Sequence, residues 1–188
     1  MHYVIEDRSQ RCSPWKCVIG IGLGDMNIIE LARAFLHDAP IGIVITDAQP
    51  VKPGPVILYA NSAFGTLTGR DVNELIGLTP RFMQGRETRR SSLDDFARAL
   101  VAGERYHGYL TNYRGDGSKY RVEIDCRPLR GSDGRIEHFM SFEREVVRRV
   151  GRPASGSAGR YEPITVSNDL LTDPLRALGA FTDGKASL

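Results

Sequence analysis

The cysteines have the most direct chemistry in this chain, because thiols bind metals, form disulfides and act as nucleophiles. There are three, Cys12, Cys17 and Cys126. Cys12 and Cys17 could form half of a metal site, but no second Cys or His pair follows at a useful spacing. An odd number of widely spaced cysteines is not a disulfide framework and favours a reducing, cytoplasmic compartment. The sequence therefore predicts no metal site.

Carboxylates and histidines are the next candidates for chemistry. Glu123 and Asp125 alternate with apolar residues, so we expect them on the polar face of a strand and not in a catalytic pair. His107 and His138 lie on or beside predicted strands, where a surface position is expected and haem ligation is the alternative. No pairing of a nucleophile with a base is evident, so the sequence predicts a protein that is not an enzyme.

Composition excludes several further classes. The chain has 188 residues, 25 basic and 23 acidic side chains, and a net charge of +2. This balance argues against a nucleic-acid partner, since DNA-binding modules concentrate basic residues on one face. No apolar run approaches the roughly 18 residues of a membrane helix. The glycine string at positions 20, 22 and 24 lacks a confident preceding strand, so we interpret it as part of a flexible leader and not as a phosphate cradle.

Helical segments flank and interrupt the first strands. A helix is predicted over residues 27–37, where Asn27 can cap the N-terminus and Glu30 occupies the capping-box position. β-Branched runs then predict a hairpin, and three more apolar patterns predict helices. The predicted strands are 41–47 and 56–60, and the predicted helices are 61–68, 71–76 and 89–102.

Three longer strands complete the pattern, at residues 106–114, 118–129 and 136–146. Gly-Asp-Gly and Gly-Ser-Asp-Gly segments join them, and both are typical of hairpin turns. The order of elements predicts an α+β fold, a five-stranded antiparallel sheet with helices on one face and an additional N-terminal helix. A sheet face closed by short helices is a usual place for a small ligand.

The motifs within this pattern are specific as a set. The segment Tyr59-Ala60-Asn61-Ser62-Ala63-Phe64 resembles the opening of the PAS superfamily. Arg81-Phe82-Met83-Gln84-Gly85, followed by Asn112-Tyr113-Arg114-x-Asp116-Gly117, resembles the light-oxygen-voltage (LOV) branch, and the flanks are similar to those of short bacterial LOV proteins. The resemblance divides the chain into a flexible leader (1–25), a flanking helix (26–37), a PAS/LOV-like sensor domain (38–147), and a flexible linker and C-terminal tail (148–188).

The resemblance implies binding of flavin mononucleotide (FMN). In LOV domains blue light drives a cysteine, placed just before the Arg of the R-F-x-Q-G motif, to form an adduct with the flavin. Here that position is Pro80. Because the thiol is absent, the resemblance implies a response to blue light or redox state without a cysteinyl adduct.

The expected cofactor-binding positions are partly retained. Arg81 matches the residue that pairs with the phosphate, Gln84 matches a pocket residue, and Asn112 matches one of two amides that read the dione edge of the flavin ring. The departures from the family pattern are Thr79 for Asn, Ala97 for the second phosphate Arg, Val122 for the second amide and Glu143 for Gln.

Glu143 leaves two hypotheses open. An ionised carboxylate would repel the acceptor atoms of oxidised flavin, so a flavin site requires Glu143 to be protonated by burial. Alternatively the ligand has been lost, and the domain is a ligand-free protein-interaction module. In both cases we expect a homodimer or a signalling partner that contacts the N-terminal helix and the outer sheet face.

Overall fold

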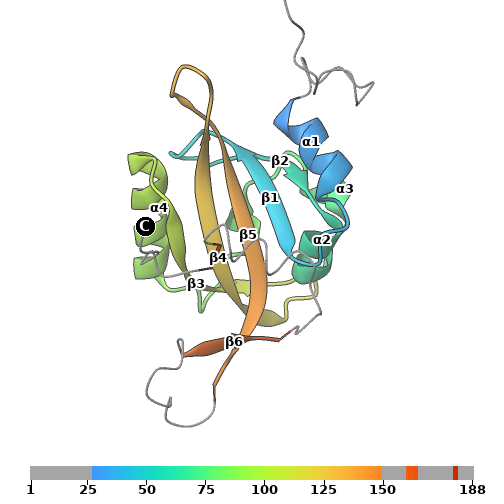
Figure 1. Ribbon diagram of the computed structural model, residues 1–188. Helices are drawn as coiled ribbons and strands as arrows, with labels where there is room; N and C mark the ends of the chain where they lie inside the picture. The colour runs from blue at the N-terminus through green and yellow to red at the C-terminus, as the bar shows by residue number, and fades with distance from the viewer. Residues whose placement is uncertain (1–26, 150–159, 165–179, 182–188) are drawn as a thin grey trace, which may run out of the picture.

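An antiparallel β-sheet forms the centre of the fold (Figure 1). The structure is a computed structural model, and it describes residues 27–149, 160–164 and 180–181. Five strands follow one another in the order β2-β1-β5-β4-β3, and β6 pairs with β5 outside this path. The strands are β1 (Gly42–Asp47), β2 (Ile57–Ala60), β3 (Tyr106–Tyr113), β4 (Lys119–Arg130), β5 (Ile136–Arg148) and β6 (Tyr161–Pro163). The predicted α+β class and five-stranded antiparallel sheet are confirmed.

Short helices connect β2 to β3, and one helix precedes β1. The helices are α1 (Ile28–Phe35), α2 (Ser62–Thr68), α3 (Val72–Leu75), the 3-10 helix η2 (Pro80–Met83) and α4 (Arg90–Ala102). Each predicted helix is present, with ends that differ by one to a few residues. None of the helices in the described part of the chain is long and apolar enough to cross a membrane.

Alternation along β1 defines the two faces of the sheet, since successive side chains of a strand point to opposite sides. Val44 packs with Phe64 of α2 and Leu75 of α3. Ile43 and Ile45 pack with α1. We call the face toward α2, α3, η2 and α4 the inner face, and the opposite face the outer face. The sheet is therefore covered on both sides.

The start of α1 has the geometry that its sequence predicts. The Asn27 side chain accepts hydrogen bonds from the backbone N–H groups of Ile29 and Glu30, and Glu30 accepts from the backbone of Asn27. This capping box satisfies donors that the first turn would leave free. Ala32 is buried against the outer face, whereas Leu31 and Phe35 are 39% and 71% exposed.

Asn61 joins four segments of the fold. Its fully buried side chain accepts from the N–H groups of Ile43 and Phe64 at 2.8 and 3.0 Å. It donates to the carbonyl oxygens of Ala39 and Ile41. The position requires both donor and acceptor atoms, and an amide supplies both. This explains why the third residue of the Tyr-Ala-Asn motif is an asparagine.

The segment after β5 differs from the sequence prediction. Residues 161–163 were expected within a flexible tail, but they form β6, which pairs antiparallel with Val146, Val147 and Arg148. Tyr161 of β6 also packs on the ring of Tyr109, with centroids 4.7 Å apart. The sequence of such a short strand does not reveal it, because three residues are stabilised as a strand by partners distant in sequence. The expected leader (1–25) and the linker residues 150–159 lie outside the described residues.

Candidate functional site

A cavity of about 130 Å³ lies between the inner face of the sheet and helices η2 and α4. Its walls are mostly apolar, with polar side chains at a few points, which is typical of small-molecule sites. The sheet side is formed by Val44, Thr46, Cys126, Phe139, Ser141 and Glu143, and the helix side includes Thr79, Pro80, Arg81, Gln84, Arg90, Leu93, Asp94, Phe96, Ala97 and Leu100.

The segment 79–84 brings four of the predicted site residues into this lining. Pro80 occupies the first turn of η2, where its fixed φ favours a helical start. Arg81 Nε donates to the carbonyl oxygen of Pro53 at 2.8 Å, which fixes the exposed guanidinium in the lining. Pro80 has no thiol, so the position expected to carry the adduct cysteine offers no nucleophile.

Glu143 is the only buried carboxylate in the described lining of the cavity. It lies on β5 between Gly42 of β1 and Ile124 of β4, and it is 4% exposed. Its Oε2 atom has no hydrogen-bond partner among the described residues. Burial raises the pKa of Glu143 to about 8, because desolvation disfavours the carboxylate. At neutral pH the group is therefore a neutral acid that can donate a hydrogen bond.

Cys126 also lines the cavity, from β4. It is 2% exposed, and its thiol interacts with the side chain of Ser141, its register partner on β5. Burial raises the pKa of Cys126 to about 12. The thiol therefore remains protonated, which makes it a poor nucleophile.

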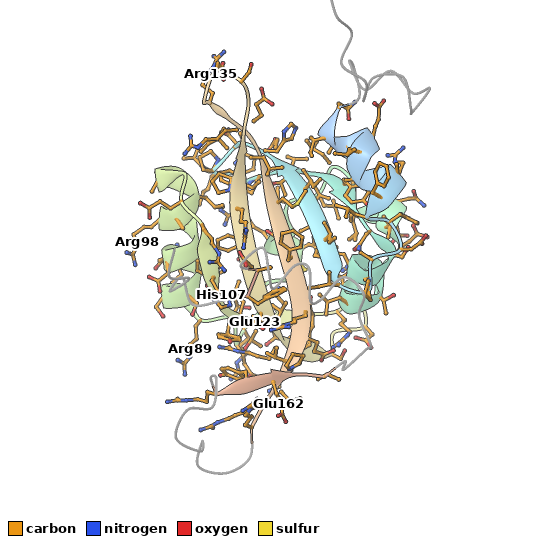
Figure 2. The ribbon with its side chains drawn as sticks, viewed as in Figure 1. Arg89, Arg98, His107, Glu123, Arg135 and Glu162 are labelled. Atoms are coloured by element: carbon orange, nitrogen blue, oxygen red, sulfur yellow. The ribbon has the colours of Figure 1, made fainter. Side chains whose placement is uncertain are left out.

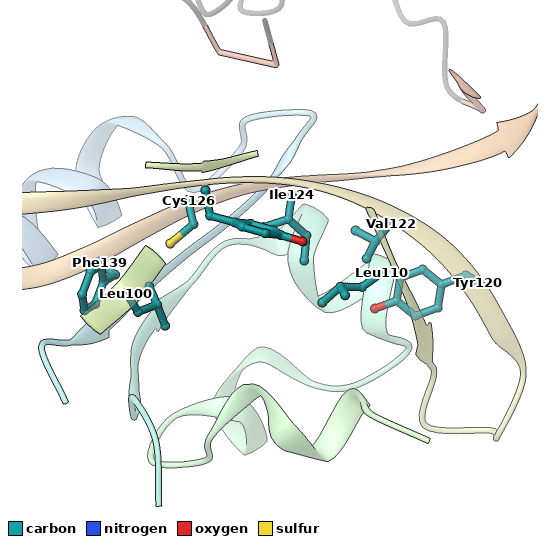
Figure 3. Close-up of a cluster of buried hydrophobic side chains, with 8 residues drawn as sticks. Leu100, Leu110, Tyr120, Val122, Ile124, Cys126 and Phe139 are labelled. Atoms are coloured by element: carbon teal, nitrogen blue, oxygen red, sulfur yellow. The ribbon is translucent and has the colours of Figure 1, made fainter. Parts of the chain in front are cut away.

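Asn112 and Val122 are not among the described residues that line the cavity. Asn112 is buried, with its amide nitrogen 3.9 Å from Met83 Sδ, and its side chain interacts with Tyr120. Figure 3 shows Val122 beside Leu110 and Tyr120, at the far end of the core cluster from Cys126, Leu100 and Phe139. The structure therefore brings together Thr79, Pro80, Arg81, Gln84 and Glu143 but leaves these two outside.

Sequence reasoning missed Ser141 and did not assign Cys126 to the site. The period of a strand could have indicated the first, because Phe139, Ser141 and Glu143 alternate on β5 and so share a face. Arg90 of α4 also lines the cavity. It pairs with Asp94 at 3.0 Å.

The outer face carries the two carboxylates that alternation assigned to the polar face of a strand, Glu123 and Asp125. Both are buried there, Glu123 at 4% and Asp125 at 0%. Figure 2 shows His107 and Glu123 together over the sheet, and His107 Nε2 lies 2.9 Å from Glu123 Oε1. Arg144 donates to the other oxygen at 2.7 Å. Burial alone would raise the pKa of Glu123, but these hydrogen bonds hold it below its usual value.

These contacts also bear on the alternatives for metal and haem. His107 Nε2 contacts Glu123, which ties the ring to a buried carboxylate of the outer face. Within the described residues, no group of three or more His, Cys, Asp or Glu side chains could hold a metal ion.

Comparisons with known proteins identify the family. The family model described as "PAS domain" matches residues 40–147, and the chain therefore belongs to the PAS domain family. It is 35% identical over 122 residues to the bacterioopsin transcriptional activator of Halobacterium salinarum, covering 64% of this chain and 18% of that protein. It is 34% identical over 124 residues to a blue-light-activated histidine kinase of Rhizobium johnstonii, covering 64% of this chain and 35% of that protein. The chain thus spans about a third or less of these curated relatives.

Solved structures of LOV domains are similar to the fold. The light-state structure of the Aureochrome1 LOV domain has 32% sequence identity and a TM-score of 0.53, and the match covers 62% of this chain and 89% of that one. A light-oxygen-voltage domain studied with a flavin analogue has 29% identity and a TM-score of 0.55, with 65% and 87% covered. The LOV resemblance of the sequence motifs is confirmed by these neighbours.

Proposed function

We propose that this chain is a sensory module of the LOV type that binds FMN in the cavity beneath the sheet. It responds to blue light or to the redox state of the flavin without a cysteinyl adduct, and it has no enzymatic activity of its own. The observation that carries the proposal is the buried, unpartnered Oε2 atom of Glu143 in an otherwise largely apolar cavity. The similarity to solved LOV domains supports the choice of ligand.

The donor set of the cavity fits the cofactor. The polar edge of oxidised flavin presents acceptors, and a protonated Glu143 supplies a buried donor for them. Arg81 and Arg90, both in the lining, suit the phosphate because guanidinium groups bind phosphate bidentately. Thr79 and Gln84 add a hydroxyl and an amide. When bound, the flavin would supply light absorption and electron transfer, and the protein would supply orientation and exclusion of water.

One observation favours a second candidate, a ligand-free PAS interaction module. Asn112 and Val122 lie outside the described cavity lining, so the ring edge that amides read in LOV domains would lack both contacts here. A neutral hydrogen bond contributes about 0.5–1.5 kcal/mol. Under this alternative the fold serves only as a docking platform.

The proposed partner surface lies on α1 and the outer face. α1 packs on the sheet through Ala32 and its neighbours, while Leu31 and Phe35 point away from it and stay exposed. Two apolar residues at i and i+4 form one stripe on a helix. We infer that a second copy of this chain, or a signalling partner, covers this stripe.

Titration with FMN distinguishes the two functions. We expect the purified, flavin-free protein to bind FMN and to retain a visible absorption band after desalting. In Arg81→Ala, loss of a charge-assisted hydrogen bond should weaken binding by about 10- to 100-fold. The matched control is Arg98→Ala, since Arg98 points outward from α4 and its side chain is 77% exposed (Figure 2). Equal loss in both variants, or none in either, would contradict the assigned phosphate site.

A further inference from the structure

Glu143 lacks the partners that usually accompany a buried carboxylate. Buried acids are normally paired with a base or receive several hydrogen bonds. Here Oε2 has no described partner, although the residue is 4% exposed. Glu123, the buried carboxylate on the opposite face, differs from Glu143 in this respect, because it forms hydrogen bonds with His107 and Arg144. The cavity side of the sheet is thus built for the neutral form of Glu143.

The charged and titratable groups around the cavity do not compensate a negative charge on Glu143. Arg90 is paired with Asp94, and Arg81 Nε is used by the Pro53 carbonyl. Glu145, two residues along β5, is held by Arg114 at 2.5 Å. β1 contributes only uncharged residues, Gly42, Val44 and Thr46. The remaining titratable groups that interact with Glu143 are Tyr120 and Cys126 of β4.

We propose that protonation of Glu143 controls flavin loading, so that the cavity accepts oxidised FMN while Glu143 is a neutral acid and rejects it once Glu143 is a carboxylate. The inference rests on the proposed function. The neutral acid donates to an acceptor on the ring, whereas the carboxylate would place two sets of lone pairs against each other without a proton between them. The site then reads pH as well as light or redox state.

The direction of the effect follows from linkage. Because burial raises the pKa of Glu143 to about 8, this carboxyl is protonated in most molecules at neutral pH. The affinity for FMN should therefore be constant at pH values well below 8. Above this pKa, the fraction of molecules in which Glu143 is protonated and able to bind falls by up to about tenfold per pH unit. Reciprocally, bound flavin raises the pKa of Glu143 further, since it stabilises the proton that it needs.

The test measures the dissociation constant of FMN by fluorescence between about pH 6 and about pH 9. For the wild-type protein we expect a flat region followed by weakening of up to about tenfold per pH unit. Glu143→Gln retains a donor at every pH, so its affinity should stay flat. Glu137→Gln is the matched control, because Glu137 lies exposed on the same strand and the variant should reproduce the wild-type curve.

A second readout does not depend on flavin. Infrared difference spectra of the flavin-free protein should show a protonated carboxyl band that disappears as the pH rises past about 8 and that is absent in Glu143→Gln. Binding of FMN with the same affinity at every pH in the wild type would overturn the gate and leave the proposed function standing. No binding of FMN at any pH would overturn both. Absence of the carboxyl band at neutral pH would remove the physical basis of the gate.

Discussion

The backbone N–H of Phe181 donates to the Asp125 carboxylate at 2.7 Å, joining two residues 56 positions apart in the chain. Asp125 is fully buried on the outer face of β4, where Arg105 and Arg127 also donate to it. The Arg144 guanidinium lies 4.2 Å from the centre of the Phe181 ring. Phe181, which lies far beyond the PAS match, is thus held against the face of the sheet opposite the cavity.

Replacing this carboxylate should destabilise the protein. Asp125→Asn removes the negative charge that Arg105 and Arg127 contact, and removing one partner of a buried ion pair costs on the order of 3 kcal/mol. Denaturant unfolding followed by circular dichroism measures the loss. The control is Asp133→Asn, whose exposed pair with Arg135 lies at a hairpin tip (Figure 2), and it should leave the unfolding midpoint unchanged. Equal midpoints for the two variants would contradict the role given to Asp125.

Asp125 also predicts sensitivity to strong acid. Burial alone would raise its pKa, but the hydrogen bonds from Arg105, Arg127 and Phe181 lower it to about 2. A carboxyl whose pKa is lowered in the folded state stabilises the fold above its usual value of 3.8, and this contribution is lost as pH falls toward 2. Unfolding midpoints measured on acidification should therefore fall more steeply for the wild type than for Asp125→Asn.

Glu143 predicts the opposite dependence in the flavin-free protein. Its pKa is raised from 4.5 to about 8 by burial, so the folded state holds a proton that the unfolded chain releases. Stability should therefore fall as pH rises from about 5 to about 8, by up to about 1.4 kcal/mol per pH unit. The difference in unfolding free energy between wild type and Glu143→Gln, measured across this range, should change accordingly. A constant difference would mean that Glu143 is ionised in the fold.

Restoring a thiol at position 80 should restore adduct chemistry. In flavin-loaded Pro80→Cys, blue light should bleach the visible absorption band, which should recover in the dark. The wild type should not bleach in this way, because its only described cysteine, Cys126, carries a thiol whose pKa is raised to about 12 by burial. Pro80→Ser controls for the altered turn. Flavin binding without bleaching in Pro80→Cys would show that position 80 does not face the ring.

The exposed apolar stripe of α1 predicts that a charged substitution there changes the oligomeric state. Phe35 is 71% exposed and Leu31 is 39% exposed, so Phe35→Glu should weaken any dimer without unfolding the monomer. Sedimentation velocity at several concentrations would report the change. Val101→Glu is the control, since Val101 is similarly exposed, at 63%, on α4. Equal sedimentation of wild type and Phe35→Glu would remove α1 from the interface.

The sequence predicted local structure better than it predicted the surroundings of single side chains. The Asn27 cap and the glycine turns depend on neighbouring residues, and both appear in the structure, with Gly117 and Gly134 at positive φ. β6 was missed because its three residues are stabilised by β5 and by Tyr109. Alternation assigned Glu123 and Asp125 to the correct face, but it did not reveal that arginines and other chain segments bury them there, because the alternation of a strand does not show what covers it.

The site shows the same limit. Alternation places Val122 on the inner face together with Cys126, yet only Cys126 reaches the cavity. Periodicity identifies a face, whereas the position of a cavity along that face depends on how α4 and η2 pack. For Glu143 the sequence left two hypotheses open, and the structure buries the side chain, which raises its pKa.

The most direct test of the account is FMN binding at neutral pH by the purified, flavin-free chain, measured by absorption after desalting and by fluorescence titration. We expect saturable binding of one FMN per chain and a retained visible band, both weakened in Arg81→Ala and unchanged in Arg98→Ala. A folded protein that passes the desalting column with no visible absorption, and that leaves FMN fluorescence unchanged during titration, would contradict the flavin-sensor account. It would establish the ligand-free PAS module in its place.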